Sequence, residues 1–137
     1  MDPWSKGFLR AGAGFLLAGL AVALAIAAKP SYTSYLRPVH AHLMLLGFVT
    51  HFIVGVSYHV LPRFTGVPIP RGLRPRLHMW SSVTGTSAMA LFFGLDRRFP
   101  GEVWHWLWIG AAALVAIAFL LFLANIYRPL FGPDPEW

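Results

Sequence analysis

The 137-residue sequence contains no cysteine, so disulfides, thiolate zinc sites and cysteine nucleophiles are all excluded. A metal bound by this chain must therefore use imidazole, thioether or oxygen ligands. Acidic side chains are also scarce, and all of them lie outside the long apolar stretches: Asp2, Asp96, Glu102, Asp134 and Glu136. Their positions exclude an intramembrane carboxylate pair for acid–base chemistry.

Charged residues make up only 12% of the chain, and the mean hydropathy is +0.61. These values are typical of a membrane protein. Four apolar stretches have the roughly 20 residues that a helix needs to cross the hydrocarbon layer, and they cover residues 7–28, 38–61, 77–95 and 103–127. We interpret the first as a span and not as a signal peptide. The predicted fold is an all-α membrane protein, a four-transmembrane-helix up-down-up-down bundle in a single domain of residues 1–137.

The basic residues fall at the ends of these stretches, so the net charge of +6 does not form the basic face typical of nucleic-acid binding. We expect a lipid bilayer, and not nucleic acid, as the partner. One side of the bundle should carry Lys6, Arg10, Arg63, Arg71, Arg74, Arg76 and Arg128, and the other Lys29, Arg37, Arg97 and Arg98. By the positive-inside rule, this seven-to-four difference predicts that both termini are cytoplasmic. The expected location is the inner (cell) membrane of a bacterium or archaeon.

Two further patterns agree with four separate spans. Prolines are predicted to lie at or beyond helix ends, where a missing amide hydrogen costs little: Pro30, Pro38, Pro62, Pro68, Pro70, Pro75, Pro100, Pro129, Pro133 and Pro135. The third stretch is polar for a span, so one of its sides must face protein, cofactor or water. Its polar residues are Ser81, Ser82, Thr84, Thr86 and Ser87.

All six histidines lie within the apolar stretches. At ~100° per residue, His40, Gly47, His51 and Tyr58 lie within about 20° of one line along the second stretch, and His42 points the opposite way. The histidines also differ in their expected depth in the membrane. Antiparallel spans would place His40, His42 and His105 in the outer layer, His59 and His78 in the inner layer, and His51 near the midplane. An unpartnered imidazole in lipid costs roughly 2 to 7 kcal/mol. We therefore expect His51 to face the bundle interior.

A haem b held by two histidines needs neutral imidazoles from different helices at one depth, with small neighbours that make room for the macrocycle. His40 and His105 meet the depth condition and are the predicted axial ligands. Gly47 and Met44 would contribute to the pocket, and Arg37 lies where it can neutralise the propionates.

The remaining histidines have two interpretations. His59 and His78 share the inner layer and would suit a second haem or a metal, and His42 and His51 are further candidate metal ligands. Alternatively, histidines near helix ends are interfacial hydrogen-bonding groups, and His51 bonds a Ser or Thr hydroxyl of the third stretch. Met44 would then be a packing residue.

The second stretch and its following loop also resemble a known family. The run RPVHAHLMLLGFVTHFIVGVSYHVLPRFTGVP resembles the HAHxM…G…G…P…TG pattern of the NnrS family of membrane proteins, which is associated with nitric-oxide stress. It is similar as well to the helix of the haem-copper oxidase and nitric-oxide reductase large subunit that starts Arg-Pro-x-His. The match of Arg37-Pro38-Val39-His40 implies that His40 is an axial ligand of haem b. Those families have about twelve spans. The helices that complete their haem-copper centre therefore have no counterpart among the four spans predicted for this sequence.

The leading functional hypothesis is a small membrane cytochrome that binds haem b for electron transfer or for binding a diatomic gas such as nitric oxide. Ligands missing from one chain would come from His105, from a second copy in a homodimer, or from a respiratory-chain partner. The second hypothesis is a copper-handling protein that uses His40, His42 and Met44, although an intact helix points the two imidazoles apart. The third is a non-catalytic accessory subunit of a respiratory complex. Enzymatic turnover is left open.

Overall fold

The computed structural model describes residues 2–132, and every regular element within them is helical. The first helix is α1 (Pro3–Ala28). A 3₁₀ turn, η1 (Pro30–Tyr32), leads into α2 (Thr33–His42), a π-helical segment η2 (Leu43–Val49) and α3 (Thr50–Thr65) without a break. The remaining helices are α4 (Leu73–Arg98) and α5 (Glu102–Phe131). The predicted all-α class is confirmed for the described part of the chain.

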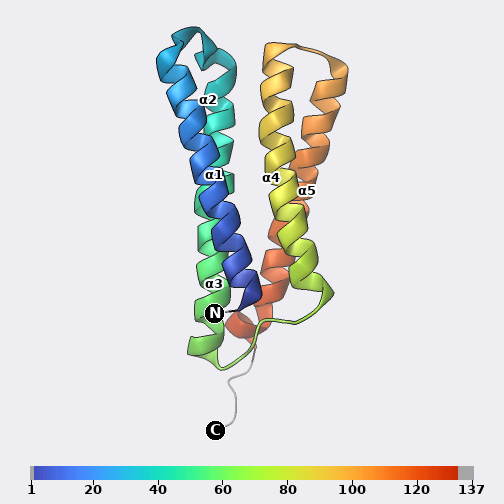
Figure 1. The fold of residues 1–137 in the computed structure, drawn as a ribbon. Coiled ribbons are helices and arrows are strands. Elements are labelled where there is room, and N and C mark those ends of the chain that lie inside the picture. Colours follow the sequence, from blue (N-terminus) through green and yellow to red (C-terminus); the bar gives the residue numbers. More distant parts are fainter. Residues whose placement is uncertain (1, 133–137) are drawn as a thin grey trace.

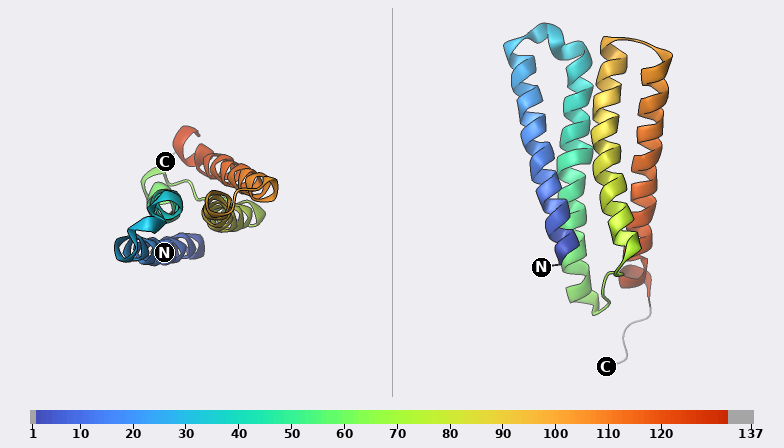
Figure 2. Two further views of the ribbon diagram at one scale, coloured as in Figure 1. Left: turned by 90° about the horizontal axis from the view of Figure 1, so that it is seen from above. Right: turned by 45° about the vertical axis from the view of Figure 1, so that its right-hand side comes forward.

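The helices form four antiparallel rods: α1, the continuous α2–η2–α3 rod, α4 and α5 (Figure 1). We call the end where α1 begins and α3 ends the inner end, and the opposite end the outer end. α1 packs along the α2–α3 rod, and α4 packs along α5 (Figure 2). α2 contacts α4, and α3 contacts both α1 and α5, so α4 separates the outer halves of α2 and α5.

Three of these rods within residues 2–132 are long and apolar enough to cross a membrane: Pro3–Ala28, Pro30–Thr65 and Glu102–Phe131. Large apolar side chains such as Leu17, Leu24 and Leu120 are left exposed on their outer faces, as lipid contact requires. The chain is therefore a membrane protein by length and composition. α4 is long enough but does not belong to this set, since its ends are charged and its middle carries hydroxyls.

One side of α4 turns polar residues into the bundle, as the sequence predicted. Ser82, Gly85 and Thr86 are buried there, whereas the hydroxyl residues Thr84 and Ser87 are exposed. Gly85 lets α5 approach closely, because a Cβ at this position would lie 3.0 Å from a side-chain carbon of Val115. α4 therefore directs the hydroxyls of Ser82 and Thr86 toward the other helices and leaves two others at the surface.

The helices are longer than predicted, and the prediction that all prolines lie at helix ends is wrong. Pro38 lies inside α2, Pro62 inside α3 and Pro129 inside α5. An internal proline removes one main-chain hydrogen bond, and in membrane helices neighbouring groups compensate for that loss. Pro62 and Pro129 also lie within about the last turn of their helices, so few helical residues follow them. The second rod therefore spans Pro30–Thr65 instead of residues 38–61.

The π-helical segment changes which way the following residues point. The amide and hydroxyl of Thr50 both bond the carbonyl of Leu45, five residues earlier, and His51 Nδ1 bonds the carbonyl of Leu46 at 2.9 Å. A π turn takes up more residues than an α turn, so residues after it are rotated relative to a regular helix. The members of the predicted stripe nevertheless all contact α1: His40 bonds the Gly19 carbonyl, Gly47 lies against Phe15, and the rings of His51 and Tyr58 lie beside that of Phe8. Below the π-helical segment, His51 and Tyr58 also reach α4.

Candidate functional site

His51 is fully buried near the middle of the bundle, as predicted. Its ring lies 4.9 Å from the ring of Phe15 and 5.7 Å from that of Phe8, both on α1. Because Nδ1 faces the Leu46 carbonyl, Nδ1 carries the proton and Nε2 accepts a hydrogen bond from the Ser82 hydroxyl at 3.1 Å. The alternative in which His51 bonds a hydroxyl of the third stretch is the one found.

His78 is also buried, and its hydrogen-bond partner comes from α3. Its Nδ1 lies 2.7 Å from the hydroxyl oxygen of Tyr58, which also accepts a hydrogen bond of 2.8 Å from the Asn125 amide on α5. Sequence reasoning missed Asn125. The available signal was a single carboxamide within the apolar run 103–127, since a polar side chain in such a run usually faces a partner.

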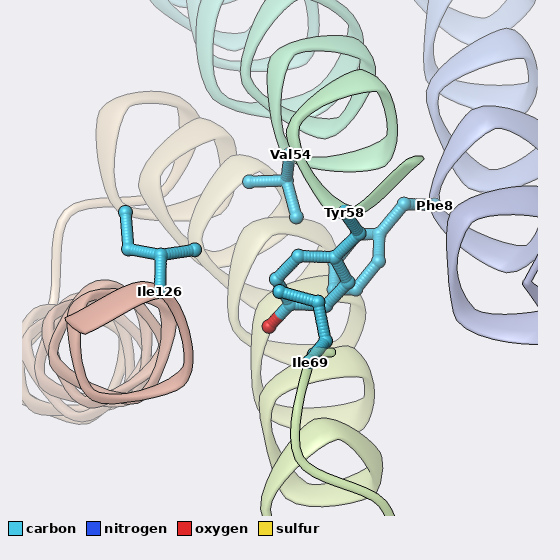
Figure 3. Packing of buried hydrophobic residues seen from close by; sticks show 5 residues of the cluster. All are labelled: Phe8, Val54, Tyr58, Ile69 and Ile126. Carbon is cyan, nitrogen blue, oxygen red and sulfur yellow. The ribbon is translucent and has the colours of Figure 1, made fainter. Parts of the chain in front are cut away.

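Tyr58 stands at the centre of the inner apolar core. Figure 3 shows its ring between Phe8 of α1 and Ile126 of α5, with Val54 one turn away on its own helix. The Phe8 and Tyr58 rings meet edge to face at 5.6 Å. This core keeps lipid and bulk water away from the Tyr58 hydroxyl, so the bonds to His78 and Asn125 act in apolar surroundings.

His40 lies half-buried at the outer end, against α1. Its Nδ1 is 2.9 Å from the carbonyl oxygen of Gly19 and donates its proton there, since a carbonyl only accepts. Its Nε2 makes no hydrogen bond to any residue from 2 to 132. Met44 lies against the same glycine, because a Cβ on Gly19 would fall 2.6 Å from the Met44 sulfur.

His42 points away from His40, as predicted. Its Nδ1 donates to the Pro38 carbonyl at 2.7 Å, and its ring lies 5.3 Å from that of Phe93 on α4. As the two histidines contact different helices, they do not converge on one ion. Within residues 2–132, no group of three or more His, Cys, Asp or Glu side chains is arranged to hold a metal.

The structure does not bring His40 and His105 together. His105 is exposed on α5 beside Trp106 and Trp108, and α2 and α5 do not approach within 8 Å at any pair of Cα atoms. The aromatic neighbours of His105 agree with a position at the membrane interface.

His59 and His78 are not brought together either. The guanidinium of Arg63 donates to Nδ1 of His59 at 2.8 Å and also to the His59 carbonyl, at the inner end of α3. His78 is instead buried against Tyr58. Each of these two imidazoles therefore has a hydrogen-bond partner other than the second histidine.

Two other predicted pocket residues have definite positions. Gly47 is buried against α1, where a Cβ would lie 2.6 Å from Cβ and Cγ of Phe15, so the phenyl ring fills the space beside it. Arg37 is exposed at the outer end, on the same helix as His40. Gly47 thus serves helix packing, and Arg37 is free to meet an anionic group at the surface.

An apolar groove of about 450 Å³ runs between α1 and α4 over the α2–η2 rod. Small side chains from Ala11, Gly14, Ala18 and Ala90 give it smooth walls, and it includes Val39, next to His40 in sequence. Cofactor pockets commonly measure roughly 300 to 1,000 Å³ and are mostly apolar. The groove has an apolar lining but is shallow and open at the surface, and His40 is not among its lining residues.

Five of the six histidines form side-chain hydrogen bonds within residues 2–132, and they fall into two groups. His51, His59 and His78 hydrogen-bond other side chains, whereas His40 and His42 bond only main-chain carbonyls and keep Nε2 free. The sixth, His105, contacts Trp106 and Trp108.

Comparison of the chain with protein families, with curated proteins and with solved structures finds no match.

Proposed function

We propose that this protein is a small membrane cytochrome that binds haem b through His40. The observation that carries the proposal is the 2.9 Å hydrogen bond between His40 Nδ1 and the Gly19 carbonyl. Such a bond fixes the tautomer, orients the ring and leaves the Nε2 lone pair for iron, as in histidines that ligate metals. The resemblance of Arg37-Pro38-Val39-His40 to the start of a haem b helix supports the same residue.

Two features near His40 support such a group. An apolar groove that is open at the surface includes Val39 and Ala18, the neighbours in sequence of His40 and Gly19. Arg37 is exposed one turn earlier at the outer end, where it can neutralise a propionate. Bound haem supplies reversible one-electron chemistry or a site for a diatomic gas such as nitric oxide. The chain contributes the oriented imidazole, the apolar walls and the surface cation.

We infer that each chain supplies one axial ligand. His105 lies on a helix that α4 separates from α2, so a second imidazole would have to come from a second copy in a homodimer or from a redox partner. Without one, His40 alone would hold the haem, and the bound haem would supply a site for a gas molecule. Low-spin spectra of the purified protein support the first arrangement, and high-spin spectra that change on addition of nitric oxide support the second.

The test is an absorption spectrum of the protein purified from cells supplied with haem precursors. Wild-type protein is expected to be red, with a Soret band and about one haem per chain or per dimer. His40→Ala should lose the band. His42→Ala is the matched control, because His42 has the same Nδ1–carbonyl arrangement on the same helix but faces α4. A normal spectrum in His40→Ala overturns the proposal.

A second candidate function is copper binding, because His40 and Met44 both lie against Gly19 and together offer nitrogen and sulfur ligands. Two ligands of one chain need further ones from a second copy or from water. Colourless protein with stoichiometric copper would support this candidate. Protein with neither pigment nor metal would favour the accessory subunit, in which histidines serve hydrogen bonding alone, as His51 and His78 do.

We also propose that α4 is a fourth span, and that both termini lie in the cytoplasm of a bacterial or archaeal cell. α4 lies alongside α5, which is apolar enough to cross, and the hydroxyls of its Ser82 and Thr86 are turned inward. Basic residues are more numerous at the inner end, including Arg71, Arg74 and Arg76 before and within the start of α4. This orientation would place His40 in the outer leaflet.

A further inference from the structure

Two short hydrogen-bonded chains lie inside the bundle, away from His40. In the first, Asn125 Nδ2 donates to the Tyr58 hydroxyl, which donates its own proton to His78 Nδ1. A neutral His78 then carries its proton on Nε2 and can donate it. In the second chain, Ser82 donates to His51 Nε2, and His51 Nδ1 donates to the Leu46 carbonyl. The Ser82 oxygen can still accept a hydrogen bond.

A small cavity lies between the ends of these two chains. Its lining includes His78 and Ser82, together with Thr86 and Thr50. The cavity offers about 10 Å³ to the centre of a water molecule, and roughly 10 to 15 Å³ of such space is enough for one. It lies between α3, α4 and α5, since Val54, Val115 and Ala118 complete its wall.

Two buried residues at this cavity carry polar atoms without hydrogen-bond partners. Thr86 is 1% exposed and His78 is 2% exposed as whole residues, and the Thr86 hydroxyl and His78 Nε2 make no hydrogen bond to any residue from 2 to 132. A buried donor without a partner costs about 1 to 3 kcal/mol. Polar atoms of this kind are usually satisfied by ordered water when a protein partner is absent.

We propose that this cavity binds one water molecule, which accepts a hydrogen bond from His78 Nε2 and donates one to Ser82 Oγ. The Thr86 hydroxyl supplies a third partner, within the two to four that a buried water needs. The water joins the two hydrogen-bonded chains into one. From Asn125 onward, each group in it donates a hydrogen bond to the next, and the last acceptor is the Leu46 carbonyl. α3, α4 and α5 are thereby tied together, and His78 is linked to His51.

The test is heteronuclear NMR of the ¹⁵N-labelled protein in lipid nanodiscs. The expected result has His78 protonated at Nε2 and His51 at Nδ1, with a magnetisation-transfer peak between water and the His78 Nε2 proton. Thr86→Val, which keeps the shape and removes the hydroxyl, should weaken or lose this peak. Thr84→Val on the exposed side of the same helix is the matched control and should retain it.

Two outcomes overturn the proposal: His78 protonated at Nδ1, or a wild-type His78 Nε2 proton with no transfer from water. An unchanged peak in Thr86→Val removes Thr86 from the site. Ser82→Ala provides a second variant that deletes the acceptor of the water, and it should lose the peak if the bridge is correct. Far-UV circular dichroism verifies that each variant keeps its helices. None of these measurements depends on haem, so they stand apart from the proposed function.

Discussion

Tyr58 on α3 and His78 on α4 are joined by a 2.7 Å hydrogen bond inside the bundle. The same hydroxyl accepts a bond from Asn125 on α5, so one side chain connects three helices. Tyr58 is only 1% exposed, and apolar side chains surround it. Within residues 2–132, Tyr58 thus takes part in two of the hydrogen bonds between helices in the inner half of the bundle, beside the bond between Ser82 and His51.

Tyr58→Phe should destabilise the protein while leaving the ring packing in place. The substitution removes both bonds and leaves a buried imidazole nitrogen and a buried amide without partners, at a cost of about 1 to 3 kcal/mol for an unsatisfied group. Equilibrium unfolding in mixed micelles with increasing sodium dodecyl sulfate measures the change.

The matched control is Tyr127→Phe on α5. Tyr127 is 61% exposed, and its hydroxyl forms no hydrogen bond to residues 2–132, so its loss should leave the unfolding curve in place. Equal stability of Tyr58→Phe and Tyr127→Phe would contradict the three-helix arrangement around Tyr58.

Ser82→Ala should have a smaller effect on stability. It deletes the donor to His51 Nε2, and interhelical hydrogen bonds in membrane proteins contribute on average about 0.6 kcal/mol, with a maximum near 1.7. Ser87→Ala, an exposed serine on the same helix, is the comparison. The same unfolding assay should place Ser82→Ala between Ser87→Ala and Tyr58→Phe. A Ser82→Ala curve that coincides with that of Ser87→Ala would show that the His51 bond adds nothing.

Much of the fold follows from hydropathy and from the cost of burying polar groups. Long apolar runs predicted helices, and the same cost predicted that His51 faces inward and that α4 turns one side to its neighbours. The opposed directions of His40 and His42 follow from helix geometry alone, since two residues on an α-helix are about 200° apart. These features depend on local sequence, which is why they could be predicted.

The features that the sequence did not predict depend on contacts between helices. The π turn at Leu43–Val49 is one of them, since nothing in the apolar run indicates it. The partnership of Tyr58 with Asn125 joins residues far apart in the chain. Pro38 lies inside a helix although it removes one main-chain hydrogen bond. None of these features follows from the local preference of the residues.

Gly47→Ala should destabilise the contact between α1 and the second rod. The new methyl would lie 2.6 Å from Cβ and Cγ of Phe15, which cannot move without its backbone, and overpacking of this kind costs about 1 to 3 kcal/mol. Gly14→Ala is the matched control on α1, since nothing lies within 4 Å of its added Cβ. It should be neutral or stabilising by up to about 1 kcal/mol, as glycine weakens a helix. Similar unfolding curves for the two variants would contradict the close approach at Gly47.

The natural lack of cysteine makes the proposed topology directly testable, because a single introduced cysteine is the only thiol in the chain. Ser31→Cys and Glu102→Cys lie at the outer end, before α2 and at the start of α5, and Arg71→Cys lies at the inner end before α4. All three positions are exposed, so none should disturb the fold. In spheroplasts, a membrane-impermeant maleimide should label Ser31→Cys and Glu102→Cys, and it should label Arg71→Cys only after the membrane is opened.

Glu102→Cys is the decisive position, because α4 separates it from Arg71. A span across the bilayer requires these two positions to label from opposite sides, despite the arginines and hydroxyls that lower the hydropathy of α4. The buried side of α4 favours such a span, since the hydroxyls of Ser82 and Thr86 meet His51 and the cavity instead of lipid. Labelling of Arg71→Cys and Glu102→Cys from the same side would show that α4 does not cross. Labelling of Arg71→Cys alone in intact spheroplasts would show that the orientation is reversed.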